Sequence, residues 1–199
     1  MATELQSEVQ ERVTGYIKHN AKKSNEAVLG IVEQGHKQLL EMIDSLSEEQ
    51  ATFMPSAEEW SVLDTMQHVV AAKKGVARMC EELARGEQPG GIGGEGQETQ
   101  KQDGVTGRTY ASLTEATAAA VAANEELIAF VNGLSDASNT EETFDHFLFG
   151  PLNCREWAVF QRVHDGDHGG QIEKIKASEG FPSAWAGRPN SISRSSGAG

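Results

Sequence analysis

Apolar residues recur at intervals of three and four through most of this 199-residue chain, and no other feature constrains its fold as strongly. This spacing places them on one face of an amphipathic α-helix. It predicts helices over residues 8–46, 61–85, 112–134 and 153–178. No stretch between turn signals alternates with period two, as a half-buried strand would. We therefore predict an all-α fold, a four-helix bundle, while the periodicity leaves both an up-down order and a crossover open.

Start and stop signals bound these helices. Capping patterns, a cap residue followed three positions later by a side chain that can reach back, begin at Ser47, Ser61, Ser112 and Asn153. Gly86 is expected to end the second helix and Gly180 the fourth. Gly15 and Asn20 favour a break near Lys22, which would set the first twenty residues apart as an arm.

A glycine-rich segment separates the second and third predicted helices. Residues 86–109 have six glycines between Gly86 and Gly96 and many Glu and Gln, a composition that buries too little apolar surface to offset its ordering entropy. We expect a long loop here, inside one domain over residues 1–180 followed by a flexible tail over 181–199. Residues 91–96 match G-x-G-x-x-G, but they follow a helix and not a strand, so nucleotide binding is not expected.

The charge and the hydropathy exclude several classes of partner. Seventeen Lys and Arg against thirty Asp and Glu give a net charge of −13, which would repel phosphate backbones and anionic lipids. No stretch approaches the roughly 18 apolar residues of a membrane helix, and the first residues lack the pattern of a signal peptide. We expect a cytoplasmic protein with no nucleic-acid or membrane partner, whose two cysteines, Cys80 and Cys154, are reduced.

Three histidines stand out as candidate metal ligands. His164 and His168 lie four residues apart, about 40° around a helix, on the face that also carries Trp157 and Phe160. Two imidazoles pointing into a core without partners would cost a few kcal/mol, and one shared divalent ion would satisfy a nitrogen of each. His68 lies at the edge of the apolar stripe of its own helix. Three imidazoles with a free coordination position suit catalytic zinc, and iron, nickel or manganese would accept the same set.

Other polar residues fit this chemistry less well. His19, His36 and His146 are expected to be solvated or locally hydrogen-bonded. Candidate acceptors for the second nitrogen of a ligating histidine are Asp64, Asp167 and Gln171. Cys154 at a helix start could serve as a nucleophile, although a small buried thiol is the favoured interpretation, as for Cys80. Gly166, Gly169 and Gly170 beside the histidine pair indicate a close helix approach, space for a ligand, or a kink.

The same residues carry a family resemblance. Trp60-Ser61 followed by Asp64 and His68, together with His164-x-x-x-His168-x-x-Gln171-Ile172, resembles the DinB-like, YfiT-like superfamily of metal-dependent enzymes over about residues 25–178. This resemblance implies a four-helix bundle whose metal is held by His68, His164 and His168. It also implies relatives that are thiol-dependent S-transferases and isomerases using bacillithiol or mycothiol. The glycines of H-D-G-D-H-G-G and the long loop depart from the common pattern.

Two functional hypotheses follow. In the first, an ion on the three histidines activates water or a low-molecular-weight thiol toward a small electrophilic substrate, giving hydrolysis or thiol transfer. In the second, the bundle is not catalytic, and it binds a structural or adventitious metal, or none, and acts through its surface. The predicted N-terminal arm favours a homodimer.

Overall fold

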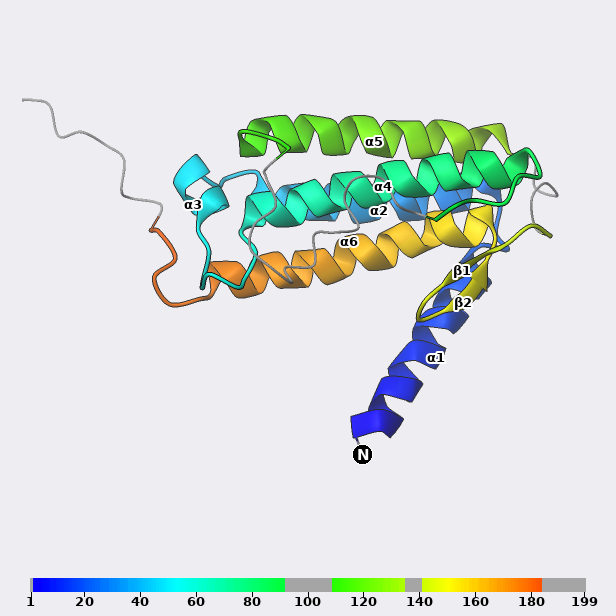
Figure 1. The fold of residues 1–199 in the computed structure, drawn as a ribbon, viewed down its shortest axis with the longest axis horizontal. Coiled ribbons are helices and arrows are strands. Elements are labelled where there is room, and N and C mark those ends of the chain that lie inside the picture. The colour runs from blue at the N-terminus through cyan, green and yellow to red at the C-terminus, as the bar shows by residue number, and fades with distance from the viewer. Residues whose placement is uncertain (1, 92–108, 135–140, 184–199) are drawn as a thin grey trace, which may run out of the picture.

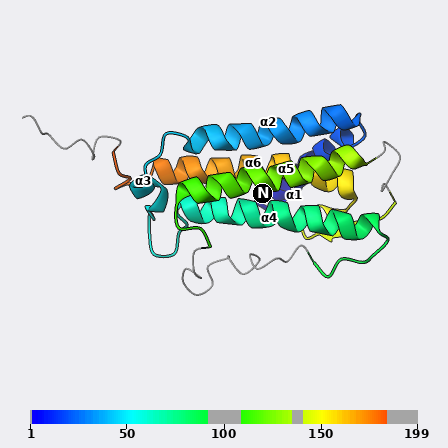
Figure 2. The ribbon, with the colours of Figure 1, turned by 90° about the horizontal axis from the view of Figure 1, so that it is seen from above.

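The computed structural model describes residues 2–91, 109–134 and 141–183. The described part contains the helices α1 (Ala2–Asn20), α2 (Asn25–Ile43), α3 (Glu48–Thr52), α4 (Val62–Ala84), α5 (Leu113–Gly133) and α6 (Cys154–Lys176), and the strands β1 (Phe144–His146) and β2 (Gly150–Leu152). The helices α2, α4, α5 and α6 lie side by side (Figures 1 and 2). The predicted four-helix bundle is confirmed.

The directions of the helices settle the question of topology. Asn25, at the start of α2, donates to the carbonyl of Leu134 just beyond α5, while Leu113, at the start of α5, donates to Glu48 of α3. α5 therefore begins at the end of the bundle where α2 stops and α4 starts, so α4 and α5 run in the same direction (Figure 1). Two helices that follow one another in the chain are thus parallel, which is a crossover order and not a simple up-down order.

The predicted first helix is two helices. α1 ends at Asn20, and α2 begins after Ser24, whose side chain accepts from the backbone N–H of Ala27. The break falls where the sequence indicates it, and α1 leaves the bundle at an angle as an arm (Figure 1). The guanidinium of Arg155 in α6 holds the turn, because its Nε donates to the carbonyl of Ala21 at 2.9 Å.

The capping patterns start helices as predicted. Ser47, Ser61 and Asn153 each form a reciprocal box with the side chain three residues on. Ser112 accepts from the N–H of Glu115, but the Glu115 carboxylate reaches the N–H of Ala111 and leaves this box half formed. Gly86 lies beyond the end of α4 with φ +73°, a left-handed conformation that glycine adopts without strain.

Two short strands lie between α5 and α6, where the sequence predicts no strand. Phe144 pairs with Leu152 and His146 with Gly150 in an antiparallel hairpin. Strands of three residues are too short to show period-two alternation, which is why the sequence did not indicate them. Phe147, at the tip, is 89% exposed.

Glycines allow α2 and α6 to approach closely. A Cβ on Gly35 of α2 would lie 3.2 Å from Cα of Arg162, and one on Gly169 of α6 would lie 2.9 Å from the sulfur of Met42. A close approach is therefore the explanation for Gly169, whereas a Cβ on Gly170 would meet nothing within 4 Å. α6 continues without a break through Gly166, Gly169 and Gly170 and ends at Lys176.

Two of the predicted segments lie largely outside the described residues. The G-x-G-x-x-G segment is outside the described residues from residue 92 on, as are most of the glycine-rich loop and the tail from residue 184. Of the tail, Phe181 packs edge to face on Phe53, and the carbonyl of Pro182 accepts from Gln50. None of the described helices is both long enough and apolar enough to cross a membrane.

Candidate metal centre

The three histidines singled out by the sequence meet in the structure. His68 comes from the first half of α4, and His164 and His168 come from α6, which runs in the opposite direction. The Nε2 atom of His164 lies 3.2 Å from Nε2 of His68 and 3.2 Å from Nε2 of His168. Among the described residues, these are the three His, Cys, Asp or Glu side chains whose ligand atoms lie close enough together, within 4.8 Å, to hold a metal ion.

The spacing of these nitrogens fits a tetrahedral ion. Two nitrogens bound at about 2.0–2.1 Å to one tetrahedral zinc ion lie about 3.3 Å apart. The two contacts of His164 are close to that value. Three imidazoles that point the same kind of nitrogen at one small volume repel one another unless a proton or a cation lies between them. The donor set therefore fits a divalent metal.

The protonation of the histidines favours ligation. Burial, together with a smaller contribution from the neighbouring His168, lowers the pKa of His68 to about 4. Burial lowers the pKa of His164 well below its usual value, with further contributions from His168 and His68. Both imidazoles are therefore neutral at neutral pH, the state in which a ring nitrogen offers a lone pair to a metal.

Two side chains hold the cluster from outside. Gln171 Oε1 lies 2.9 Å from Nδ1 of His168. The indole of Trp60 lies nearly parallel to the His168 ring, with centroids 6.3 Å apart, and 5.2 Å from the His68 ring. The buried Nδ1 atoms of His68 and His164 have no hydrogen-bond partner in the described part of the chain. Of the three histidines, His168 is thus the one whose second nitrogen is held.

The other acceptors predicted from the sequence lie elsewhere. Asp64 is part of the cap of α4, where its carboxylate accepts from the N–H and hydroxyl of Ser61 at 3.0 and 2.6 Å. Asp167 is exposed. Gln171 is therefore the predicted candidate that the structure places against the cluster.

The predictions for His19, His146 and the two cysteines agree with the structure. His19 is exposed, and Cys80 and Cys154 are buried free thiols, as predicted. His146 is buried, and its Nδ1 accepts from the backbone N–H groups of Leu148 and Phe149, which is a local hydrogen bond.

The prediction for His36 is wrong. Its side chain is only 7% exposed, and neither ring nitrogen has a partner among the described residues. Its pKa falls to about 4, first because it is buried and then because Lys73 is positively charged. The burial of His36 could have been predicted from the sequence, since this residue falls on the apolar stripe of Val32, Leu39 and Ile43.

A second polar group in the core was missed altogether. Lys73 of α4 forms a buried ion pair with Asp165 of α6 at 2.8 Å, and both side chains are fully buried. The available signal was a lysine at a position where the apolar stripe of α4, which includes Val69 and Val76, requires a core residue.

The fold and the site together define a class of protein, a four-helix bundle in which three histidines from two helices converge on one point. The family model described as the DinB superfamily matches residues 31–172, a stretch that contains His68, His164 and His168. The chain belongs to the DinB superfamily.

One solved structure supports the fold. The chain is similar to the protein of "Crystal structure of TT2238, a four-helix bundle protein", with a TM-score of 0.56 and 21% sequence identity over 78% of this chain and 100% of that one. At this identity the likeness shows the fold alone. The comparison with curated proteins finds no match.

Proposed function

We propose that this protein is a metal-dependent enzyme in which His68, His164 and His168 hold a divalent ion. The observation that carries the proposal is the convergence of three Nε2 atoms from two helices, with adjacent contacts of 3.2 Å. Two further facts support it. The pKa values of His68 and His164 are lowered, and the second nitrogen of His168 is held by Gln171.

The donor set indicates the kind of chemistry. Three neutral nitrogen ligands leave a coordination position for water or substrate, which is typical of catalytic zinc, while nickel, iron and manganese accept the same ligands. When bound, such an ion lowers the pKa of a coordinated water or thiol and polarises an electrophile. We infer hydrolysis or thiol transfer on a small-molecule substrate, with a low-molecular-weight thiol as the co-substrate in the second case.

Two side chains, Gln171 and Trp60, orient the imidazole ring of His168. Gln171 holds the His168 ring so that Nε2, and not Nδ1, faces the other histidines. Trp60 covers one face of the same ring and flanks His68, which leaves that side of the cluster apolar. A partly water-excluded site of this kind strengthens the electrostatic interactions inside it.

Metal content tests the ligand set. Tag-free protein is purified as wild type, His68→Ala, His164→Ala and, as the matched control, His19→Ala, in which an exposed histidine is removed. We expect about one ion per chain in the wild type and the control, and loss of the ion in the other two variants, measured by mass spectrometry. An equal metal content in all four proteins would contradict the proposed three-histidine site.

Two further measurements separate a catalytic from a structural ion. An open catalytic site should lose its ion to a chelator with little change in the melting temperature, whereas a structural ion should be needed for folding. A thiol-dependent assay with a generic electrophile, run with zinc, nickel, iron and manganese, then tests turnover. Full metal occupancy without turnover for any metal and thiol would favour the non-catalytic alternative.

A further inference from the structure

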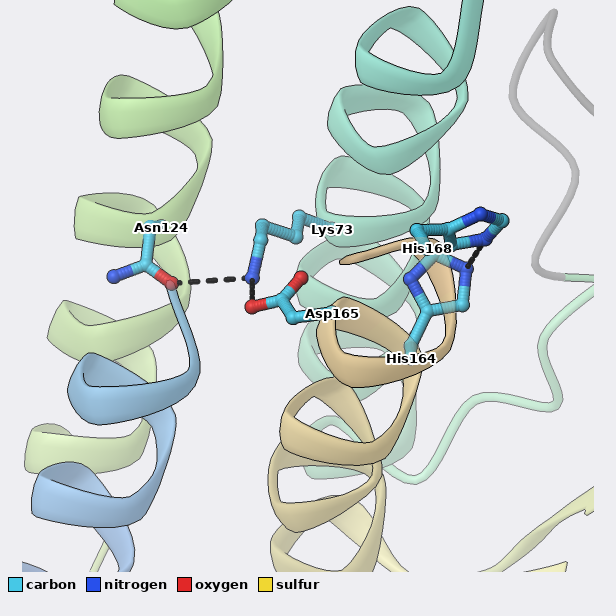
Figure 3. A network of polar contacts seen from close by, with 5 residues as sticks. All are labelled: Lys73, Asn124, His164, Asp165 and His168. Carbon is cyan, nitrogen blue, oxygen red and sulfur yellow. Dashed lines mark hydrogen bonds and ion pairs between the residues drawn. The ribbon is translucent and has the colours of Figure 1, made fainter. Parts of the chain in front are cut away.

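A buried charged group lies directly beside the histidine cluster. Lys73 Nζ lies 2.8 Å from Asp165 Oδ2 and 3.3 Å from Asn124 Oδ1, so the group joins α4, α5 and α6 (Figure 3). The side chains of Lys73 and Asp165 are both fully buried. The second oxygen of Asp165 has no partner among the described residues.

Stability alone does not account for this ion pair. Removing two charges from water costs about as much as their mutual attraction returns, and two well-packed apolar side chains of similar size are often at least as stabilising. Both side chains of this pair are fully buried, so neither charge is solvated. The group therefore calls for an explanation other than the strength of the bundle.

The position of the Lys73–Asp165 pair in the fold supplies such an explanation. Asp165 follows His164 directly, so the two side chains leave α6 about 100° apart. Lys73 follows His68 in α4 by little more than one turn. The same two helices are thus linked twice, by the contact of His68 with His164 and by the ion pair. Figure 3 shows that His164 and Asp165 point away from α6 on different sides.

The middle of α6 carries few apolar side chains. Residues 166–170 include Gly166, Gly169 and Gly170, which carry no side chain. Between Gln161 and Ile172, the buried side chains of α6 are those of Asp165 and His168, so polar groups and not apolar side chains determine how this stretch meets α4.

A buried ion pair resists a shift of α6 on α4. If α6 turned or slid on α4, Lys73 and Asp165 would separate and each would be left as an unpaired buried charge, which is far more costly than the pair itself. Buried polar groups of this kind are known to fix helix register in coiled coils. A metal site needs its ligands held within about 0.5 Å.

We propose that Lys73 and Asp165 are positioning residues, which fix the rotation and register of α6 on α4 so that the three Nε2 atoms converge. This proposal rests on the three-histidine metal site proposed above. It assigns the ion pair a role in metal affinity that is separate from its contribution to the stability of the fold.

The test exchanges the ion pair for apolar side chains. In the double variant Lys73→Met/Asp165→Leu, we expect urea denaturation to give a free energy of unfolding of the metal-free protein at or above that of the wild type. The Kd for zinc, from competition with a chelator, should rise at least about tenfold. The matched control is Lys37→Met/Glu41→Leu, which removes an exposed pair of α2 and should change neither quantity.

A second variant and a metal-free readout complete the experiment. The amide pair Lys73→Gln/Asp165→Asn keeps a hydrogen bond in place of the charges, and we expect it to bind zinc more loosely than the wild type and more tightly than the apolar pair. In NMR spectra of the metal-free proteins, the indole N–H of Trp60 and the imidazoles of His164 and His168 should give shifted or multiple signals in the apolar variant.

The outcomes separate the two proposals. Zinc binding as tight as that of the wild type in either folded variant, or unchanged histidine and indole signals in the apolar variant, would overturn the positioning role. Failure of the wild type to bind zinc through its histidines would instead overturn the metal site, and the NMR comparison would still decide whether Lys73 and Asp165 set the arrangement of α6.

Discussion

Gln171 Oε1 lies 2.9 Å from Nδ1 of His168, one turn further along α6. Because an amide oxygen only accepts, the hydrogen of the His168 ring is on Nδ1, and Nε2 keeps its lone pair. That nitrogen lies 3.2 Å from Nε2 of His164, so its lone pair faces the other histidines. A single hydrogen bond within one helix thus selects the tautomer that a metal at this site would need.

Replacing Gln171 with leucine should weaken metal binding while the fold is retained. The leucine fills the space of the glutamine but cannot accept from Nδ1, so the ring loses its fixed orientation and tautomer. Loss of such a partner typically costs about 10–100-fold in metal affinity. Competition with a chelator measures the Kd for zinc, and Gln171→Glu, which keeps an acceptor oxygen, should stay near the wild-type value. Equal affinities of Gln171→Leu and the wild type would contradict this role.

Two glycines of α2 should respond in opposite ways to alanine. Gly30→Ala adds a Cβ that meets nothing within 4 Å, so it should stabilise the protein by up to about 1 kcal/mol through helix propensity. Gly35→Ala places its Cβ 3.2 Å from Cα of Arg162 and closer still to that side chain, so α2 and α6 must separate. We expect Gly35→Ala to destabilise by about 1–3 kcal/mol. Urea denaturation of the two variants decides the matter, and a stabilising Gly35→Ala would show that the approach is not tight.

The helices and the histidine cluster were predictable because each depends on local or periodic information. Ser61 and Asn153 mark helix starts by residue type alone, and the spacing of His164 and His168 fixes a common face. Which helix would lie opposite this face depends on the packing of the whole chain. For His68 the sequence offered a position at the edge of an apolar stripe, together with a family resemblance.

The features that the sequence did not predict are the burial of His36 and Lys73 and the short hairpin. The burial of both side chains depends on contacts between segments distant in sequence. His36 and Lys73 have residue types that are usually solvated, and their neighbours on the apolar stripes were the available evidence that they are buried. The partner of Lys73 lies 92 residues away, so no spacing rule could find it. The hairpin around Gly150 escaped notice because three-residue strands carry no recognisable alternation.

Removing Arg155 should release the arm. The Arg155 guanidinium, in a side chain that is almost fully buried, donates to the carbonyl oxygens of Ala21 and Lys23 and to Oδ1 of Asn25. Arg155→Met leaves these acceptors unpaired at the turn between α1 and α2. Since a hydrogen bond from a charged group contributes about 1.5–3 kcal/mol, we expect a loss of at least that size in the free energy of unfolding.

Hydrogen exchange locates the effect of Arg155→Met. The amides of residues 21–25 should exchange faster than in the wild type, while those in the centre of α4 should change less. The control is Arg85→Met, which removes an exposed guanidinium paired with Glu87 and should leave both stability and exchange nearly unchanged. Unaltered exchange at residues 21–25 in Arg155→Met would mean that α1 is held by its apolar contacts alone.

His146 should make the protein less stable in acid. Burial lowers its pKa to about 4, and its Nδ1 can accept from the N–H groups of Leu148 and Phe149 only while it is unprotonated. In the unfolded chain the pKa returns to about 6.5, so between these values the unfolded state binds more protons than the folded one. The contribution of His146 is therefore fully present above about pH 6.5 and is lost as the pH falls through about 4.

Urea denaturation at several pH values between 4 and 7 measures this loss. A histidine with this shift adds a slope of at most about 1.4 kcal/mol per pH unit to the free energy of unfolding. His146→Leu removes this slope whatever its effect on the absolute stability, because leucine binds no proton in either state. His19→Leu removes an exposed histidine and should keep the wild-type slope. If His146→Leu kept the wild-type slope as well, the acid sensitivity would have to come from other groups.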